Sequence, residues 1–143
     1  MMTKRTTKYQ ILTKKSQIEQ LVTKLLRSKE FCHDFETNSL KTHTNTFQIV
    51  GAAFATVPEE IFYVPFNRPI EGINSPTELV DLLRMPIENE NIGKIGQNLK
   101  YEYKVWDAIG VELKNIVLDT MIASYCIFGD KFSHSLDEMC LNH

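Results

Sequence analysis

The sequence predicts an α/β fold in which a mixed sheet of five strands, three antiparallel and then two parallel, is flanked by helices. Three apolar runs between residues 30 and 66 are joined by short turns, which favours antiparallel neighbours. Beyond residue 75, helical patterns alternate with short strands, as parallel crossovers require. A chain of 143 residues, 43% of them hydrophobic, can bury one core, so we expect a single domain over residues 1–143.

The first half of the chain is predicted to hold one helix and three strands. Ser16-Gln17-Ile18-Glu19 has the form of a capping box, and apolar residues follow it at helical spacing through Leu26. The next elements are shorter apolar runs bounded by polar turns. The predicted strands are 30–35, 46–56 and 61–66, with a polar turn over 38–45 and a hairpin at Pro58-Glu59-Glu60.

The second half is predicted to alternate helices and strands. Ser75 and Pro76 stand where the N-cap and first residue of a helix belong, and Asp119 is expected to cap a later helix that runs through Ile127. Ser135-Leu136-Asp137-Glu138 repeats the capping-box pattern for a last helix. The other elements are a helix that carries Leu79, Leu82 and Leu83, a strand over 92–96, a helix over 98–109 ended by Gly110, and a strand over 116–118.

Cysteine usage and hydropathy exclude several classes of protein. The three cysteines lie far apart and form no Cys-x-x-Cys pair, so neither a disulfide framework nor a zinc site is expected. The longest apolar run, 49–55, is too short to cross a bilayer. We therefore expect a cytoplasmic protein with no membrane partner.

The charges are unevenly distributed along the chain. Residues 1–30 contain 8 Lys or Arg and 2 Asp or Glu, whereas the remainder contains 8 basic and 16 acidic residues. A protein that held duplex DNA by its phosphates alone would need a basic main surface. A nucleic-acid partner would therefore have to be held by something other than a broad basic face.

Two carboxylates close the predicted strand 30–35. Asp34 and Glu36 are two residues apart, so on a strand they project from the same face, roughly 6–7 Å apart at 3.3 Å per residue. Two acids in an apolar strand are costly unless a positive group offsets their desolvation, and a divalent metal does so where no Lys or Arg is near. A strand end that runs out into solvent explains the pair equally well.

A third carboxylate, Glu102, lies near the start of the predicted helix 98–109. One acid there is commonplace, since it complements the helix dipole. In an α/β sheet, however, ligands gather at the carboxyl ends of strands, and both acidic groups follow such ends. If the strands 30–35 and 92–96 are neighbours, the acids meet.

Three other groups of side chains invite functional interpretations. Ser133, His134, Ser135 and Asp137 contain the residue types of a hydrolase triad, but they are contiguous, and Ser135 is better explained as a helix cap. The remaining cases are more typical of a core than of a site. These are His33, expected as a hydrogen-bonded core histidine, and the aromatic residues Tyr101, Tyr103 and Trp106, whose alternative is a base-stacking strip.

Six ordered blocks of sequence resemble a known family. They are FCHDFETNSL, IVGAAFA, YVPF, IGQNLKYE, GVELKNIVLDTMIASY and HSLDEMCLNH. In this order and with these gaps they are similar to the 3′–5′ proofreading exonuclease domain of bacterial DNA polymerase I, the family A polymerases. The resemblance runs from about Tyr9 to His143.

The resemblance implies an RNase H-like fold and a two-metal hydrolysis of the 3′-terminal phosphodiester of single-stranded DNA, in replication and repair. It assigns Asp34 as the carboxylate that bridges two Mg²⁺ or Mn²⁺ ions, Glu36 as a ligand of the ion that activates water, and Glu102 as a ligand of the second ion. The implied contacts with the terminal nucleotides are Leu40, Gln97 and Asn98. Implied partners are the DNA 3′ end and a polymerase domain, at the bacterial nucleoid.

The sequence departs from the family pattern in two places. The family has aspartate where this chain has Glu102, and the extra methylene displaces the carboxylate by more than about an ångström from a strict magnesium geometry. The third motif of the family, Tyr-x-x-x-Asp, is expected beyond His143, so we expect a domain without that C-terminal part and without a polymerase domain. Tyr125 has Gly129 four residues later and Asp130 five residues later.

These departures keep other functions open. One alternative is a catalytically inactive, vestigial or truncated RNase H-like scaffold with a structural or DNA-positioning role. Another is an α/β domain that binds a small molecule. The last helix, without neighbours, is also expected to expose an apolar face that drives self-association.

Overall fold

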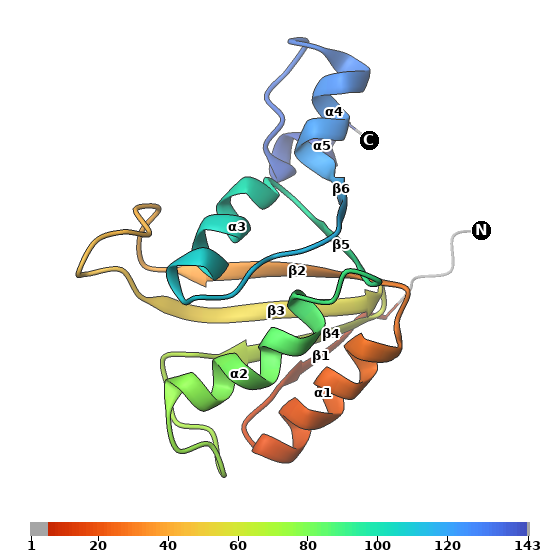
Figure 1. Cartoon of the computed structure of the whole chain (residues 1–143). Coiled ribbons are helices and arrows are strands. Elements are labelled where there is room, and N and C mark those ends of the chain that lie inside the picture. Colours follow the sequence, from red (N-terminus) through yellow and green to blue (C-terminus); the bar gives the residue numbers. More distant parts are fainter. Residues whose placement is uncertain (1–5, 143) are drawn as a thin grey trace.

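A six-stranded sheet in the order β1-β4-β3-β2-β5-β6 forms the centre of the molecule (Figure 1). The computed structural model describes residues 6–142, the last of these by its backbone alone. The strands are β1 (Lys8–Ile11), β2 (Glu30–Thr37), β3 (Ile49–Val57), β4 (Glu60–Pro65), β5 (Gly93–Gly96) and β6 (Ile116–Asp119). The helices are α1 (Lys15–Arg27), α2 (Pro76–Ile87), α3 (Leu99–Ala108), α4 (Thr120–Phe128) and α5 (Leu136–Asn142).

The strand directions confirm the predicted mixed topology. Strands β2, β3 and β4 are antiparallel neighbours, and β5 and β6 continue the sheet in parallel on the other side of β2. The sheet has six strands rather than five, because β1 pairs in parallel with the outer edge of β4. All four residues of β1 are exposed, so this strand is formed by pairing with β4 and leaves no alternating apolar pattern.

The capping residues of two helices can be compared with the predicted ones. Ser75 caps α2 as predicted, since its hydroxyl oxygen accepts a hydrogen bond of 3.2 Å from the backbone N–H of Glu78. The capping box expected from Ser16 to Glu19 is wrong, because α1 begins at Lys15. Instead, the side-chain oxygen of Gln17 accepts from the backbone N–H of Lys14 at 3.1 Å.

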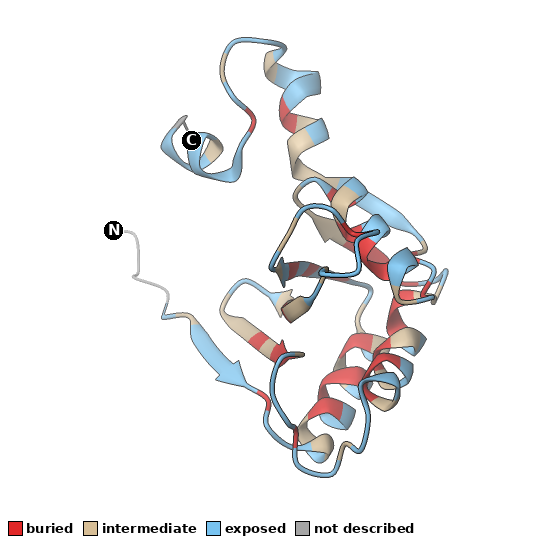
Figure 2. Cartoon of the chain, turned by 90° about the vertical axis from the view of Figure 1, so that its left-hand side faces the viewer, coloured by how far each residue is buried: buried red, intermediate tan, exposed pale blue. Residues whose placement is uncertain are grey.

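The core lies on one face of the sheet. Strand β2 alternates strictly: Phe31, His33 and Phe35 are buried, whereas Cys32, Asp34 and Glu36 are exposed. Helices α1, α2 and α3 contribute buried apolar side chains to this core together with β3, β4 and connecting segments, and Figure 2 shows the buried residues concentrated between these helices and the strands. The acidic pair of β2 therefore projects from the face that these three helices do not cover.

The C-terminal part is much less covered than the rest. Helix α4 is apolar in sequence, yet Ser124 is its only buried residue. Figures 1 and 2 show α4 standing away from the sheet. Exposed apolar side chains in this part are Ile116, Val117, Leu118, Ile122, Tyr125, Ile127, Leu136 and Leu141.

Two further features bear on the class of protein. Cys32, Cys126 and Cys140 are exposed free thiols. Among residues 6–142, no helix combines the length and apolar character needed to cross a membrane.

Candidate functional site

The predicted meeting point of the acids is built where β2 and β5 separate. The two strands are parallel neighbours, and their pairing ends at Cys32 opposite Ile95. Asp34 and Glu36 lie just beyond this point on β2, and α3 starts shortly after β5 ends. The acids therefore gather at the carboxyl ends of two adjacent strands, which is where open α/β sheets bind ligands.

Glu102 fills the space between the diverging strands. Its residue is only 2% exposed, and its carboxyl group accepts a hydrogen bond from the backbone N–H of Phe35 on β2. Its Oε2 atom is buried and has no hydrogen-bond partner among the described residues. A buried carboxylate oxygen without a partner is unfavourable, so this atom is placed to accept a proton or a cation.

The three carboxyl groups are electrostatically linked. Burial is the main reason that the pKa of Glu102 rises to about 7, and repulsion from Asp34 and Asp119 raises it further. Burial also raises the pKa of Asp34, with added repulsion from Glu36. Both shifts have the same two causes, burial of a carboxyl group first and repulsion from neighbouring acids second.

The donor set fits a hard divalent cation, although the side chains are not closed around one. Asp34, Glu36 and Glu102 offer only carboxylate oxygens, the ligands that Mg²⁺ and Mn²⁺ prefer. Among residues 6–142, no group of three or more His, Cys, Asp or Glu side chains is arranged to hold a metal ion. Asp34 and Glu36 are exposed on the open face, whereas Glu102 is buried. Repulsion between like charges favours this separation of the three carboxylates.

The residues expected to contact DNA lie on two different segments. Gln97 and Asn98 form the connection from β5 to α3, and Leu40 lies in the loop after β2, 82% exposed. The amide of Gln97 is engaged within the protein: its Nε2 donates to the carbonyl of His134 at 2.9 Å, and its Oε1 accepts from Thr120 at 2.5 Å. Only Leu40 and Asn98 are therefore fully open to a ligand.

A tyrosine ties these two segments together. The hydroxyl of Tyr101, on α3, donates to the carbonyl of Ser39 at 2.9 Å and lies 2.5 Å from the hydroxyl of Thr37. This contact holds the loop with Leu40 against the helix with Glu102. The sequence analysis assigned Tyr101 to an aromatic group without finding this role, because the partner atoms lie on a loop more distant in sequence than any helical spacing.

The other aromatic residues of α3 do not form a stacking strip. Trp106 is fully buried, with its ring centroid 4.6 Å from that of Phe35, as the core interpretation predicted. Tyr103 is 47% exposed and takes no part in the core cluster. The aromatic residues of α3 therefore do not share one exposed face, and the base-stacking alternative is not supported.

His33 is a core residue, but it lacks the expected hydrogen bonds. Neither ring nitrogen has a partner among the described residues, and the ring packs among those of Phe31, Phe54 and Trp106. Burial, assisted by the charge of Lys94, lowers the pKa of His33 to about 3. The imidazole is therefore neutral at physiological pH.

The serine and histidine near the C-terminus do not form a hydrolase triad. His134 is buried, with its Nε2 2.7 Å from the carbonyl of Gly129 and its Nδ1 2.7 Å from the hydroxyl of Ser124. The carbonyl requires Nε2 to donate, so Nδ1 accepts from Ser124. A carbonyl occupies the place that a triad gives to a carboxylate. Ser135 acts as the predicted cap, accepting from the N–H of Glu138 at 3.4 Å.

A groove of about 310 Å³ runs along the open sheet face beside Asp34. Its lining is largely apolar, with Ala53, Ile61 and Leu136 among the contributors, and Gln97 and Thr120 close one end. The groove is therefore an apolar surface that ends at a carboxylate. Such a surface suits a flat, partly apolar ligand that also carries a group to be placed beside Asp34.

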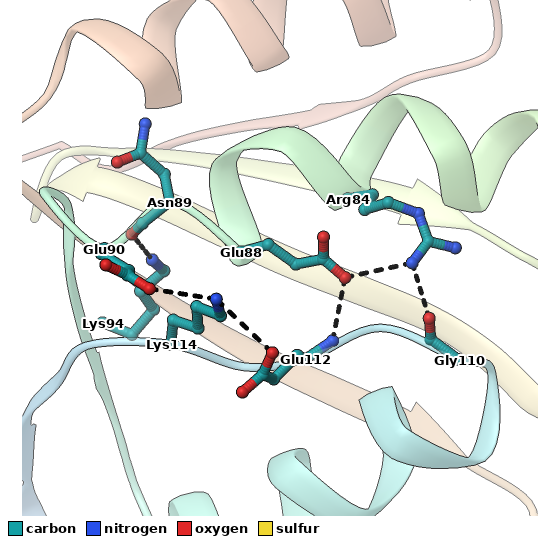
Figure 3. A network of polar contacts seen from close by, with 8 residues as sticks. All are labelled: Arg84, Glu88, Asn89, Glu90, Lys94, Gly110, Glu112 and Lys114. Atoms are coloured by element: carbon teal, nitrogen blue, oxygen red, sulfur yellow. Dashed lines mark hydrogen bonds and ion pairs between the residues drawn. The ribbon is translucent and has the colours of Figure 1, made fainter.

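The opposite end of the sheet is fixed by a polar network between α2 and the segments that lead into β5 and β6 (Figure 3). Glu88 accepts from Arg84 at 3.0 Å and from the N–H of Glu112 at 3.1 Å. Lys94 is buried, and its ammonium donates to the carbonyls of Asn89 and Ile92 at 2.6 and 2.9 Å. Burial lowers the pKa of Lys94 to about 8. The remaining contacts are Arg84 with Gly110 and Lys114 with Glu90 and Glu112.

Comparison with known proteins identifies relatives over nearly the whole chain. The sequence model of a family described as 3′-5′ exonuclease matches residues 9–143. DNA polymerase I of Synechocystis sp. is 31% identical over 135 residues, which are 92% of this chain and 14% of the relative. DNA polymerase I of Borreliella burgdorferi is 29% identical over 120 residues, 84% of this chain and 13% of the relative. The chain thus spans about one seventh of the length of these curated relatives.

Solved structures share the fold. The POL domain of Pol1 from M. smegmatis, in complex with DNA primer-template and dNTP, has a TM-score of 0.74 at 14% identity, over 94% of this chain and 22% of that one. Brucella melitensis NrnC with bound Mg²⁺ has a TM-score of 0.65 at 19% identity, over 94% of this chain and 60% of that one. The mixed sheet with its helices is therefore the RNase H-like fold that these structures share. With the family match and the polymerase relatives, the chain belongs to the 3′-5′ exonuclease family of DNA polymerase I.

Proposed function

We propose that this chain hydrolyses the 3′-terminal phosphodiester of single-stranded DNA, as a proofreading 3′-5′ exonuclease does. The observation that carries the proposal is the buried, unpartnered carboxyl oxygen of Glu102, which interacts electrostatically with Asp34, in a chain that belongs to a 3′-5′ exonuclease family. The polymerase relatives favour this function over the inactive scaffold and over small-molecule binding.

Each acid has a separate role in the proposed reaction. Asp34 interacts electrostatically with both other carboxylates and would bridge two Mg²⁺ or Mn²⁺ ions, while Glu36 and Glu102 would each hold one of them. Two such ions, when bound, supply a hydroxide nucleophile and stabilise the leaving 3′ oxygen. The backbone N–H groups of Glu102 and Phe35 favour the ionised form of the Glu102 carboxyl group. Without cations, the clustered negative charge repels the phosphate of the substrate.

The proposed substrate is a frayed single strand rather than a duplex. The apolar groove beside Asp34 would hold a terminal base, with Leu40, Gln97 and Asn98 around the last nucleotides. Stacking on apolar surface holds bases without reading their sequence. Duplex binding would demand a basic main surface, whereas residues beyond 30 carry 16 acidic and 8 basic side chains.

A direct assay tests the proposed activity. A 5′-labelled single-stranded oligonucleotide is expected to shorten stepwise from its 3′ end in Mg²⁺ or Mn²⁺, and to remain intact in EDTA. An otherwise identical oligonucleotide with a phosphorothioate at its last linkage serves as the substrate control. Absence of shortening in both metals, together with no change in melting temperature on adding either metal, would contradict the proposal.

The cellular setting follows from the polymerase relatives. We propose that residues 1–143 act as one exonuclease-like domain, in the cytoplasm at the nucleoid, on 3′ ends that a polymerase domain of the same protein presents. The supporting observation is that the chain aligns with 14% and 13% of two DNA polymerase I chains.

Self-association through the C-terminal helices is a further part of the proposal. Ile127 on α4 and Leu141 on α5 are 70% and 82% exposed, and α4 is apolar around its circumference. Sedimentation equilibrium is expected to show concentration-dependent dimers that Ile127→Glu weakens. A monomer mass at every concentration of the parent chain would exclude this contact.

A further inference from the structure

Residues at the junction of β6 and α4 form hydrogen bonds with the connection between β5 and α3. The carboxylate of Asp119 accepts from the backbone N–H groups of Asn98 at 3.0 Å and Leu99 at 2.7 Å. The same carboxylate caps its own helix, α4, by accepting from Met121 and Ile122 at 3.0 and 3.3 Å. One side chain therefore satisfies the first amides of two helices that are not adjacent in sequence.

The next residue, Thr120, contacts the same connection. The hydroxyl of Thr120 lies 3.2 Å from the carbonyl of Gly96 and 2.5 Å from the side-chain oxygen of Gln97. Together, Asp119 and Thr120 bind consecutive polar groups along residues 96–99. We name this set of contacts the 119–120 clasp.

Helix α3 depends on the clasp because it has no cap of its own. Asn98 stands at its N-cap position in the left-handed region, with φ 56° and ψ 48°, and its side chain makes no capping hydrogen bond. The free amides at the start of α3 are instead paired with Asp119. Glu102 lies in the first turn of this helix, so the position of its carboxyl group follows the position of the helix start.

We propose that Asp119 and Thr120 are positioning residues for the exonuclease reaction, which hold residues 96–99 so that Asn98 and Glu102 face the DNA 3′ end together. The inference rests on the proposed function and adds to it residues that touch neither substrate nor metal. Sites of this kind need their groups held within about 0.5 Å of the productive geometry. The clasp supplies this restraint through hydrogen bonds from the end of β6 and the start of α4.

Variants of the clasp test the inference in the full chain. Asp119→Ala is expected to lower kcat roughly 10- to 100-fold, the range found when outer partners of metal-site ligands are removed. Its affinity for a fluorescent single-stranded oligonucleotide in EDTA, measured by anisotropy, is expected to fall as well, since Asn98 loses the hydrogen bond that holds it. Thr120→Val should lower kcat in the same direction, and Thr120→Ser should restore it because the hydroxyl is kept.

Ser75→Ala is the matched control, since it removes a helix cap from α2, which carries none of the acids of the site. Hydrogen exchange at the Leu99 amide measures the clasp directly and is expected to accelerate in Asp119→Ala but not in Ser75→Ala. If Leu99 exchange accelerates while kcat and oligonucleotide affinity match those of Ser75→Ala, the inference fails and the proposed function stands. If the parent chain neither cleaves nor binds the oligonucleotide, the proposed function fails and the inference with it. If Asp119→Ala does not fold, the comparison of Thr120→Val with Thr120→Ser decides: equal kcat values overturn the inference.

Discussion

Asp34→Ala is expected to reduce 3′-terminal hydrolysis by about a thousandfold. Metal-assisted catalysis supplies several kcal/mol of charge stabilisation in the transition state, and each 1.36 kcal/mol is a factor of ten in rate. Asp34 interacts electrostatically with both Glu36 and Glu102. Its loss therefore removes the ligand that connects the other two. The measurement is single-turnover cleavage of a 5′-labelled oligonucleotide at saturating Mn²⁺.

Stability separates this effect from unfolding. Burial and repulsion raise the pKa of Asp34, which means that its charge disfavours the folded state. Asp34→Ala should therefore melt at or above the temperature of the parent chain in EDTA. Glu30→Ala is the control, because it removes an exposed acid from the other end of the same strand. A variant that lacks Asp34 and still cleaves with the metal dependence of the parent would refute the assigned role.

Glu102→Gln is expected to abolish a large pH dependence of stability in EDTA. The pKa of Glu102 is about 7 in the folded chain against an ordinary value of 4.5. The unfolded chain therefore loses this proton first, and the free energy of unfolding falls as the pH rises from 4.5 to 7. At 1.36 kcal/mol per pKa unit the loss is about 3 kcal/mol. The glutamine variant should equal the parent near pH 4 and exceed it by up to about 3 kcal/mol at pH 8.

Urea unfolding followed by the fluorescence of Trp106, the single tryptophan, measures this difference. Asp107→Asn, which neutralises an exposed acid on the same helix, should follow the pH curve of the parent. Adding Mg²⁺ at pH 8 should stabilise the parent more than the glutamine variant, because a cation bound only by the folded state shifts the equilibrium towards it. Parallel pH curves for parent and Glu102→Gln would show that Glu102 does not retain its proton.

The sequence was informative where a local pattern and the tertiary structure agree. The two-residue spacing of Asp34 and Glu36 placed both side chains on one face of a strand. That β2 and β5 are neighbours was only a condition for the acids to meet, and the structure meets this condition. The missing hydrogen bonds of His33 could not be foreseen, because a single sequence does not show which rings surround it. Strand β1 was missed for a related reason: it forms because it pairs with the edge of β4, and its own sequence has no strand pattern.

The clasp was only half visible in the sequence. The spacing of Asp119 ahead of an apolar helix predicted a cap for α4, and that cap is present. The two further bonds to Asn98 and Leu99 connect residues that are far apart in sequence, and no periodicity reports such a contact. The same limit applies to Tyr101 and the loop that it holds. Contacts that position the acids are therefore harder to predict than the acids themselves.

The parallel pairing of β2 with β5 also determines when the site can form during synthesis. The acids of β2 leave the ribosome early, with β3 and β4 directly behind them, whereas the strand on their other side follows only after α2. Pairings between distant residues raise the contact order and slow folding. A nascent chain that has not reached Asp119 contains Asp34 and Glu36 without the anchored helix that brings Glu102 to them. Because α3 follows β2 across β3, β4, α2 and β5, the three acids can come together only after all of these elements have been synthesised.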